Sequence, residues 1–325
     1  MKPPRISVCI PTYNYARYLP CAIESVLSQR FGDFELIVQD DRSTDDTTDV
    51  VRGYASRDAR IRFDVNPSRL GLVGNWNRCL SLAGGTNVKF VFADDALSSP
   101  YALGKMSSVL DGHPEVSLVG SPRTLVDAEG RVLGVKADFR GDRIEEGAGI
   151  TRRCLLREAN LIGEPSVVMF RRSDAARGFH PEYRHLPDIE MWFHLLERGK
   201  FAFIDEPLSL FRVHPGQQTA RNLETYADIE DLFLLFRDYA SKPSLGLGGW
   251  TRRYLQYDVT YRYWKLYKRG IIGKGEMREK IGTHMDFRWF LLILPCYKTY
   301  KPFYKAFLRL RQSLVAVRKE PPSRG

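Results

Sequence analysis

The sequence has few cysteines and lacks the glycine-rich motifs that hold nucleotide phosphates or present a nucleophilic serine. Its five cysteines are scattered and include no C-x-x-C pair, which argues against a disulfide framework or a zinc site and favours a reducing compartment. No G-x-G-x-x-G follows the first predicted strand and no G-x-x-x-x-G-K-[ST] occurs, which disfavours dinucleotide dehydrogenases and P-loop enzymes. G-x-S-x-G is also absent, so serine hydrolase chemistry is not expected.

Long apolar runs are absent as well. The run Ile6–Ile10 is too short for the core of a signal peptide. The longest run near the end, Trp289–Pro295, is far below the roughly 20 residues that a membrane-spanning helix needs. These features predict a cytoplasmic protein without a spanning helix.

The chain does contain enough apolar sequence for a full core, and its charge is unevenly distributed. Its 325 residues are 43% hydrophobic and 27% charged, which is typical of a globular protein of one large or two modest domains. The formal net charge is +10, and residues 251–325 contain 18 Lys or Arg and 5 Asp or Glu, a local net charge of +13. The basic character therefore belongs to the tail.

Two predicted strands end in adjacent carboxylates. The apolar run Val88–Phe92 leads to Asp94-Asp95, and Phe34–Val38 leads to Asp40-Asp41. Strand and helix patterns alternate over the first hundred residues, which predicts a mainly parallel sheet with helices on both faces. Ligands of such sheets bind beyond the carboxyl ends of the strands, where both pairs would lie. A divalent cation would relieve the repulsion within a pair, whereas the alternative for Asp94-Asp95 is a turn that caps the next helix.

Local signals predict several element boundaries. Ser43 is predicted to cap a helix through a capping box with Asp46, and Ser99 with Pro100 to open another helix. The segment from Lys136 to Gly149 is rich in glycine and charge, which predicts a mobile loop. The shape of any pocket would depend in part on that loop.

Four stretches occur in an order and spacing that is specific as a set. They are Ser7–Asn14 (SVCIPTYN), Ser25–Gln29 (SVLSQ), Phe34–Asp45 (FELIVQDDRSTD) and Phe92–Asp95 (FADD). Together they resemble the family 2 inverting glycosyltransferases, and the resemblance covers residues 5 to 215. It implies the GT-A fold, an α/β architecture with a Rossmann-like, mainly parallel sheet and flanking helices.

The resemblance implies that residues near the strand ends bind a nucleotide-sugar donor. These residues are Pro11, Thr12, Tyr13, Asp41, Arg69, Asn77 and Asp94. Pro11 and Tyr13 would flank the base, and Asp41 would accept a hydrogen bond from its ring N–H. Asp94 would hold ribose or sugar hydroxyls. For Asn77 the alternative is a polar position on a helix surface.

The resemblance also implies a metal ion on Asp95. This carboxylate would bind Mn²⁺ or Mg²⁺ bridging the diphosphate, as Mg²⁺ commonly does between carboxylate and phosphate oxygens. The family often has a D-x-D-D motif here, and Phe92 replaces its first acid, which leaves fewer metal ligands. His214, in an Arg-x-His stretch, would touch the diphosphate or the metal, and the alternative is a strand-end histidine bonded to backbone.

Asp188 matches the second acid of the family's catalytic-base motif, an acidic pair just before an apolar helix. Pro187 replaces the first acid. From its position alone, Asp188 would be read as a helix N-cap. Glu164 and Trp192 would lie on the acceptor side, with a pre-proline loop position as the alternative for Glu164.

These assignments predict an inverting glycosyltransferase. Asp188 would remove the acceptor hydroxyl proton as that oxygen attacks the anomeric carbon of a nucleotide-diphosphate sugar, most simply a UDP-sugar. The acceptor would be a saccharide or a lipid-linked saccharide, as in cell-envelope polysaccharide biosynthesis. Two alternatives stay open, namely a metal-dependent nucleotidyltransferase and a non-catalytic protein that binds membranes or polyanions through a degenerate transferase domain.

The tail is predicted to form a separate helical region. The transferase domain would span residues 1–222, and the C-terminal region residues 223–325. Lys and Arg interleaved with Trp, Tyr and Phe suit an anionic membrane surface, which would make the protein peripheral at the inner face of the membrane. The alternative is a solvated helical pair packed on the catalytic domain. Nucleic-acid binding is not expected, because no RNA-binding motif accompanies the basic residues.

Overall fold

The computed structural model describes residues 3–217, 222 and 225–317, with side chains to residue 301 and at 303. It divides into two compact units, Met1–Leu235 and Phe236–Gly325. The sequence predicts a domain boundary between residues 222 and 223. This position lies within the first unit, before its last helix.

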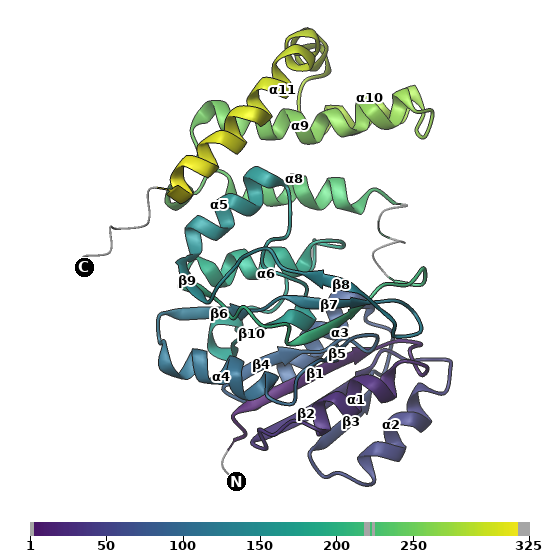
Figure 1. Cartoon of the computed structure of the whole chain (residues 1–325). Helices are drawn as coiled ribbons and strands as arrows, with labels where there is room; N and C mark the ends of the chain where they lie inside the picture. The colour runs from purple at the N-terminus through teal and green to yellow at the C-terminus, as the bar shows by residue number, and fades with distance from the viewer. Residues whose placement is uncertain (1–2, 218–221, 223–224, 318–325) are drawn as a thin grey trace, which may run out of the picture. The chain divides into compact units, whose positions relative to one another are not determined.

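The first unit is built on an eight-stranded sheet (Figure 1). In spatial order its strands are β3 (Ile61–Val65), β2 (Phe34–Asp40), β1 (Ile6–Thr12), β4 (Asn87–Phe90), β10 (Val168–Arg171), β6 (Val116–Gly120), β11 (Lys200–Phe203) and β9 (Arg143–Glu146). Strands β3, β2, β1 and β4 are mutually parallel, whereas β10 runs antiparallel to both of its neighbours. The carboxyl ends of β1, β2 and β4 therefore meet at one edge of the sheet.

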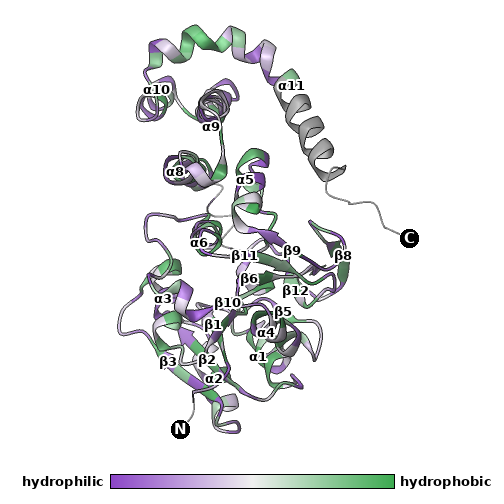
Figure 2. Cartoon of the chain, turned by 90° about the vertical axis from the view of Figure 1, so that its left-hand side faces the viewer, coloured by the Kyte–Doolittle hydropathy of each residue, from purple (hydrophilic) through white to green (hydrophobic). Residues whose placement is uncertain are grey.

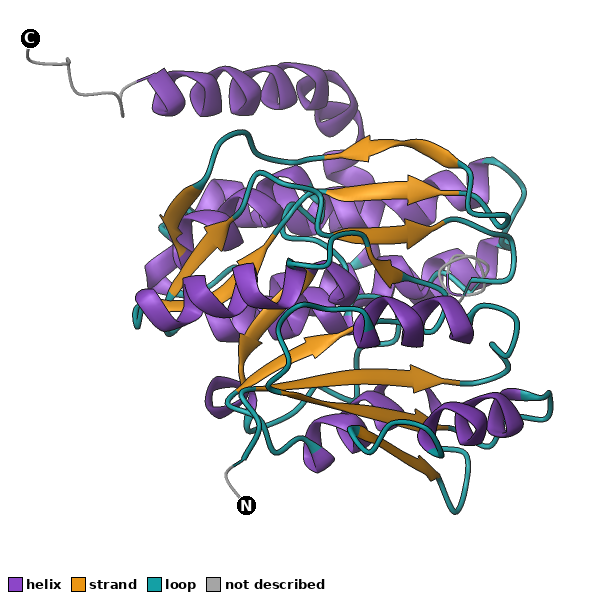
Figure 3. Ribbon diagram, turned by 60° about the horizontal axis from the view of Figure 1, so that its bottom comes forward, coloured by secondary structure: helices purple, strands orange, loops and turns teal. Residues whose placement is uncertain are grey.

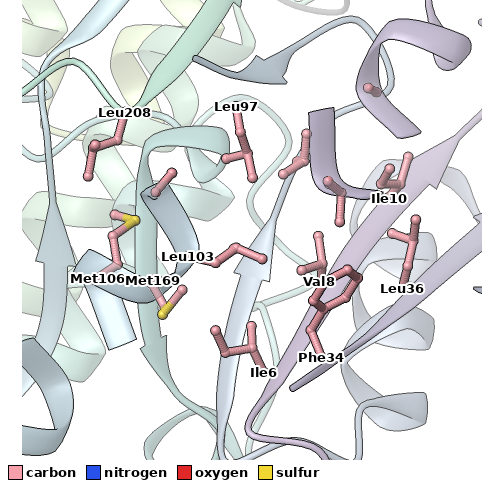
Figure 4. Packing of buried hydrophobic residues seen from close by; sticks show 14 of the residues in the cluster. Ile6, Val8, Ile10, Phe34, Leu36, Leu97, Leu103, Met106, Met169 and Leu208 are labelled. Atoms are coloured by element: carbon pink, nitrogen blue, oxygen red, sulfur yellow. The ribbon is translucent and has the colours of Figure 1, made fainter. Parts of the chain in front are cut away.

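Helices flank this sheet, as Figure 3 shows. Those of the first unit are α1 (Leu19–Leu27), α2 (Thr47–Ala55), α3 (Gly71–Leu82), α4 (Ala102–Gly112), α5 (Gly147–Arg157) and α6 (Pro187–Leu196), with α8 (Ala227–Tyr239) beginning in it. The core between strands and helices is continuous: Val8 of β1 and Leu36 of β2 belong to the same cluster of buried residues as Leu103 and Met106 of α4 (Figure 4). The predicted α/β architecture, a mainly parallel sheet with flanking helices, is confirmed.

A smaller four-stranded sheet completes the first unit. Its strands, in spatial order, are β5 (Ala96–Leu97), β12 (Ser209–Arg212), β7 (Arg123–Val126) and β8 (Val132–Lys136). Strands β7 and β8 are antiparallel neighbours that form a hairpin. Because β5 follows the acidic turn directly and β12 pairs with it, this sheet brings the chain around residue 212 next to Asp94-Asp95.

Two local predictions are wrong, the first of them in part. The segment Lys136–Gly149 is a loop only over residues 137–142, because Lys136 ends β8, β9 pairs with β11 and α5 begins at Gly147. Gly141 lies in that loop, and the other two glycines belong to α5. Ser43 does not cap α2: its hydroxyl donates to Asp40 and accepts from the Asn14 N–H, while Asp45 accepts from the N–H of the first helical residue.

Two boundaries also differ from the prediction by a few residues. Strand β4 ends at Phe90, so Phe92 and the two aspartates lie in the turn that follows. Helix α4 begins at Ala102 and not at Pro100, because residues 99–101 form a turn before it.

The second unit is helical. It contains α9 (Gly249–Lys268), α10 (Lys274–Gly282) and α11 (Phe287–Val317). Tyr257 of α9 stacks on Phe290 of α11 with ring centroids 5.1 Å apart, and its hydroxyl donates to the Phe290 carbonyl at 2.8 Å. Within the described part of the chain, no helix is both long and apolar enough to cross a membrane.

Candidate active site

A cleft of about 550 Å³ lies at the carboxyl ends of β1, β2 and β4. Its lining includes ten of the twelve residues that the sequence places in a site: Pro11, Thr12, Tyr13, Asp41, Arg69, Asp94, Asp95, Glu164, Asp188 and His214. These residues come from segments up to 200 positions apart in the chain. All of them belong to the first unit, so the fold of that unit alone assembles the cleft.

The wall at the ends of β1 and β2 holds two stacked side chains. The Arg69 guanidinium carbon lies 3.8 Å from the centre of the Tyr13 ring, which is a close cation–π contact. The loops after the two strands are joined by Asn14, whose side-chain oxygen accepts from the Thr44 N–H at 2.7 Å. Asn14 and Arg42 have φ of 59° and 64°, and such left-handed backbone is uncommon outside glycine and often marks a functional loop.

Asp41 is held by the start of helix α3. One carboxylate oxygen accepts from the Leu70 N–H at 2.7 Å and from the Asn66 amide at 2.9 Å, and the other accepts from the Gly71 N–H at 2.9 Å. Backbone N–H groups at a helix N-terminus favour negative charge, so the carboxylate is fixed in place. It still lines the cleft, and an oxygen with a spare lone pair can accept from a ligand.

Arg212 fixes the acidic turn from the side of β12. Its backbone N–H donates to Asp95 Oδ1 at 3.0 Å, and its Nε donates to the Asp94 carbonyl at 2.9 Å. Its Nη1 donates to the carbonyls of Asp127 at 3.0 Å and Ala128 at 3.3 Å in the β7–β8 turn. This nearly buried arginine therefore joins the acidic turn to the smaller sheet.

The side chains of Asp94 and Asp95 have different partners. Asp94 Oδ2 lies 3.1 Å from His214 Nε2, and both side chains are about nine-tenths buried. Asp95 Oδ2 is buried with no hydrogen-bond partner among the described residues. Burial, together with the adjacent charge of Asp94, raises the pKa of Asp95 well above its usual range.

An unpartnered carboxylate oxygen of this kind fits a hard cation. Mg²⁺ and Mn²⁺ prefer oxygen ligands, and Mg²⁺ is commonly held by one or two carboxylates together with phosphate oxygens. Among residues 3–217, 222 and 225–317, no cluster of three His, Cys, Asp or Glu side chains could hold a metal by itself. The arrangement therefore suits a metal that a ligand helps to coordinate.

Lys89 is buried beneath the acidic turn. Its ammonium group donates to the carbonyls of Phe90 and Ser166. Ser209 also donates to the Ser166 carbonyl, at 2.6 Å, and the Ser166 hydroxyl accepts from the Phe92 N–H at 2.9 Å. Burial lowers the pKa of Lys89 to about 7, and the negative charge of Asp95 opposes that shift. These contacts join the end of β4 to the segment that carries Glu164.

Glu164 is held by a buried arginine of the smaller sheet. Arg123 is 1% exposed, and its guanidinium lies 2.8 Å from one Glu164 oxygen and 3.0 Å from the other. The preceding Gly163 has φ of +119°, and a Cβ there would lie 2.5 Å from the Val167 side chain. A glycine is therefore required where the chain turns into the cleft.

Asp188 lies in the first turn of α6 and lines the same cleft. Burial raises its pKa to about 7, and the nearby charges of Glu164 and Asp231 act in the same direction. The buried face of α6 includes Ile189, Trp192 and Phe193. A carboxyl group with a pKa near 7 is suited to general-base catalysis near neutral pH.

Asp231 of α8 anchors the segment that leads to Asp188. One of its carboxylate oxygens accepts from three consecutive backbone N–H groups, at Arg184, His185 and Leu186, over 2.5 to 2.8 Å. The residue is 1% exposed, and burial raises its pKa. A charged acceptor from a distant helix thus fixes the backbone just before the proposed base.

Two predicted site residues do not line the cleft. The Asn77 amide is fully engaged with one residue, donating to the Phe179 carbonyl at 2.9 Å and accepting from its N–H at 2.7 Å. Trp192 is completely buried, and its ring N–H donates to the Gly163 carbonyl at 3.0 Å. Both side chains bond to backbone of segments near the cleft, and neither belongs to the proposed site.

Sequence patterns do not reveal the residues that hold this site together. Lys89, Arg123 and Arg212 are the single charged residues of short strands, and Asp231 follows Glu230 in an amphipathic helix. The available signal for such a residue is a charged side chain within a predicted buried strand, because charged side chains are rarely buried without a partner. Lys89 shows it most clearly, as the one charged residue in the run Val88–Phe92.

The model of the family Glycosyl transferase family 2 matches residues 7–179, which is more than half of the chain. The chain belongs to glycosyl transferase family 2. The matched segment contains the predicted donor residues and Glu164, and it ends before Asp188 and His214.

Relatives of known sequence support this membership. An uncharacterized protein of Mycobacterium tuberculosis is 34% identical over 237 residues, which are 70% of this chain and 73% of that protein. The GalNAc(5)-diNAcBac-PP-undecaprenol beta-1,3-glucosyltransferase of Campylobacter jejuni is 30% identical over 211 residues, which are 65% of each chain.

Solved structures show the same fold. S. aureus TarS, in complex with UDP-GlcNAc, has a TM-score of 0.60 at 18% identity and is similar over 80% of this chain and 73% of its own. The mannosyltransferase PcManGT of Pyrobaculum calidifontis, in complex with GDP-Man and Mn²⁺, has a TM-score of 0.58 at 19% identity. The similarity covers 98% of this chain and 89% of PcManGT.

Proposed function

We propose that this family 2 glycosyltransferase transfers a sugar from a nucleotide-diphosphate donor to an acceptor hydroxyl with inversion at the anomeric carbon. The observation that carries the proposal is that Asp95 and Asp188 line one cleft although 93 positions separate them. Single-displacement transfer needs one base and a stabilised leaving group, and needs no protein nucleophile.

Asp188 is the proposed catalytic base. Its carboxylate accepts the proton of the acceptor hydroxyl while that oxygen forms a bond to the anomeric carbon and the bond to the diphosphate breaks. Its raised pKa makes it a stronger base than an exposed aspartate, yet one that is still largely ionised slightly above neutral pH. The charge of Glu164 contributes to the raised pKa of both Asp188 and Asp95. Glu164 is proposed to face the acceptor.

Pro11, Thr12, Tyr13, Asp41, Arg69 and Asp94 are the proposed donor-binding residues. The stacked Tyr13 and Arg69 offer a flat surface for the base, and Asp41 offers a fixed acceptor. Asp95 would hold Mn²⁺ or Mg²⁺ through its unpartnered oxygen, with His214 beside it on Asp94. A bound divalent metal would supply charge stabilisation for the leaving diphosphate.

The substrates are proposed by similarity and by chemistry. A UDP-sugar is the proposed donor, since TarS was solved with UDP-GlcNAc, and GDP-Man is the competing choice from PcManGT. The glucosyltransferase relative, whose name specifies an undecaprenol-linked saccharide, supports a lipid-linked acceptor of the kind used to build cell-envelope polysaccharides. All five cysteines are free thiols, which supports a cytoplasmic location.

The stereochemical outcome tests this proposal without an identified acceptor. The protein is incubated with UDP-GlcNAc, UDP-glucose or GDP-mannose and Mn²⁺, and proton NMR follows the first anomer of the sugar released to water. We expect the anomer opposite in configuration to the donor, and no release by Asp188→Asn. Release of the retained anomer would contradict the mechanism. Asp174→Asn, outside the cleft, is the matched control and should behave as wild type.

A further inference from the structure

One side of helix α11 is apolar and exposed. Its residues, here called the α11 stripe, are Trp289, Leu292, Ile293, Cys296, Tyr300 and Phe303. At the helical repeat of about 3.6 residues they fall within a sector of about 100°. Trp289 is 62% exposed, Leu292 66% and Phe303 70%. Figure 2 shows hydrophobic residues along the described part of this helix.

The other side of α11 is already occupied within the C-terminal unit. Phe290, Leu294 and Tyr297 are buried. Phe290 stacks on Tyr257 of α9, and both Tyr297 and Lys301 bond to Asp258. These contacts fix the rotation of the helix about its axis, so the α11 stripe stays outside the core of its own unit.

The helix that carries the stripe has charge of one sign. Its 31 residues include six Lys or Arg and no Asp or Glu. Arg288 and Lys298 are exposed on its first half. The surface that binds the stripe should therefore be apolar at its centre and negatively charged around it. A second copy of this chain is a poor match, because it would bring the same positive charge.

We propose that the α11 stripe binds the surface of a bilayer containing anionic phospholipids, with the helix lying in the plane of the interface. Trp, Leu and Phe side chains enter the boundary between headgroups and acyl chains, and Lys and Arg contact the phosphate layer. This inference rests on α11 alone and is independent of the chemistry proposed for the cleft. It would hold the enzyme at the surface where a lipid-linked acceptor is found.

Vesicle co-sedimentation of the full chain tests the proposal directly. The vesicles are phosphatidylcholine alone, and phosphatidylcholine with phosphatidylglycerol in equal parts. We expect binding to the mixed vesicles, weakened about tenfold by raising the salt and at least about tenfold by Trp289→Ser, Leu292→Ser and Phe303→Ser together. Arg288→Glu, which reverses the charge beside the stripe, should weaken binding about tenfold while leaving the apolar stripe intact.

The matched control removes three exposed apolar side chains elsewhere. Val132→Ser, Leu133→Ser and Val135→Ser on β8, where these residues are 69%, 59% and 58% exposed, should leave vesicle binding unchanged. Circular dichroism and the melting temperature check that every variant folds. Equal binding by wild type and the α11 variants would overturn the proposal. Failure of the wild type to bind the mixed vesicles would also overturn the proposal. One such case is a dimer in which the stripe joins two copies of the chain and which the serine variants dissociate.

Discussion

The two walls of the cleft are stabilised in different ways. The donor wall consists of the ends of β1, β2 and β4, which a ladder of parallel strand pairs holds in place. The proposed acceptor wall consists of Glu164 and the segment before α6, which the single charged residues Arg123 and Asp231 hold. A strand ladder spreads its stabilisation over many bonds, whereas a buried charge concentrates it in one side chain. The acceptor wall should therefore be the easier one to disturb or to change during evolution.

Removal of the Asp95 charge should have the largest effect on the donor wall. Asp95→Asn keeps the shape of the side chain but replaces the unpartnered oxygen and its charge, so we expect at least about a thousandfold loss of turnover. The melting temperature should stay level or rise, because the repulsion from Asp94 is relieved. Turnover within tenfold of wild type, or turnover unchanged in EDTA, would contradict the proposed metal site.

Arg212 connects the acidic turn of the donor wall to the β7–β8 turn, and its loss should destabilise both turns. Arg212→Ala leaves the carbonyls of Asp94, Asp127 and Ala128 without a donor, which should lower the free energy of unfolding by about 3 kcal/mol. Urea denaturation measures this change. Arg131→Ala, which removes an arginine from the nearby exposed turn, should cost less than about 1 kcal/mol. Equal losses would show that Arg212 is not a structural link.

Asp231 should affect the acceptor wall alone. Asp231→Asn weakens the bonds to three backbone N–H groups before Asp188, so we expect kcat to fall about tenfold with unchanged affinity for UDP and Mn²⁺. Asp228→Asn removes a charge near His185 from the same helix and controls for electrostatics. A change in nucleotide affinity would contradict the separation of the two walls.

The pH dependence should report the base of the acceptor wall. Because burial raises the pKa of Asp188 to about 7, its carboxyl group is protonated and inactive as a base at lower pH. We expect kcat to fall about tenfold for each pH unit below 7 and to level off above it. A rate that stays constant down to pH 5 would rule out Asp188, with this pKa, as the base.

Asn77 should have the smallest effect, since it lies in neither wall. Asn77→Ala removes two hydrogen bonds to Phe179, which should lower the free energy of unfolding by about 1 to 2 kcal/mol. Nucleotide affinity, measured by calorimetry, should not change. A clear loss of affinity would return Asn77 to the donor site.

The same contrast explains which parts the sequence could predict. The donor wall follows from local patterns, because an apolar run ending in Asp40-Asp41 or Asp94-Asp95 fixes both the strand and its polar end. The errors at Lys136–Gly149 and Ser43 arose where a contact with a distant segment overrides local preference, namely β11 in one case and Asn14 in the other. The contact of Asp231 with residues 184–186 joins segments 45 to 47 positions apart and has no local signature.

The proposed mechanism gives Asp95 and Asp188 separate roles, metal binding for Asp95 and proton removal for Asp188. Calorimetric titration of UDP with Mn²⁺ and the initial rate of sugar release are measured on Asp95→Asn and Asp188→Asn side by side. We predict that Asp188→Asn binds UDP and Mn²⁺ as wild type does while its rate falls by about a hundredfold or more. We predict that Asp95→Asn loses the metal-dependent part of binding. An Asp188→Asn variant that releases sugar at the wild-type rate would contradict the account.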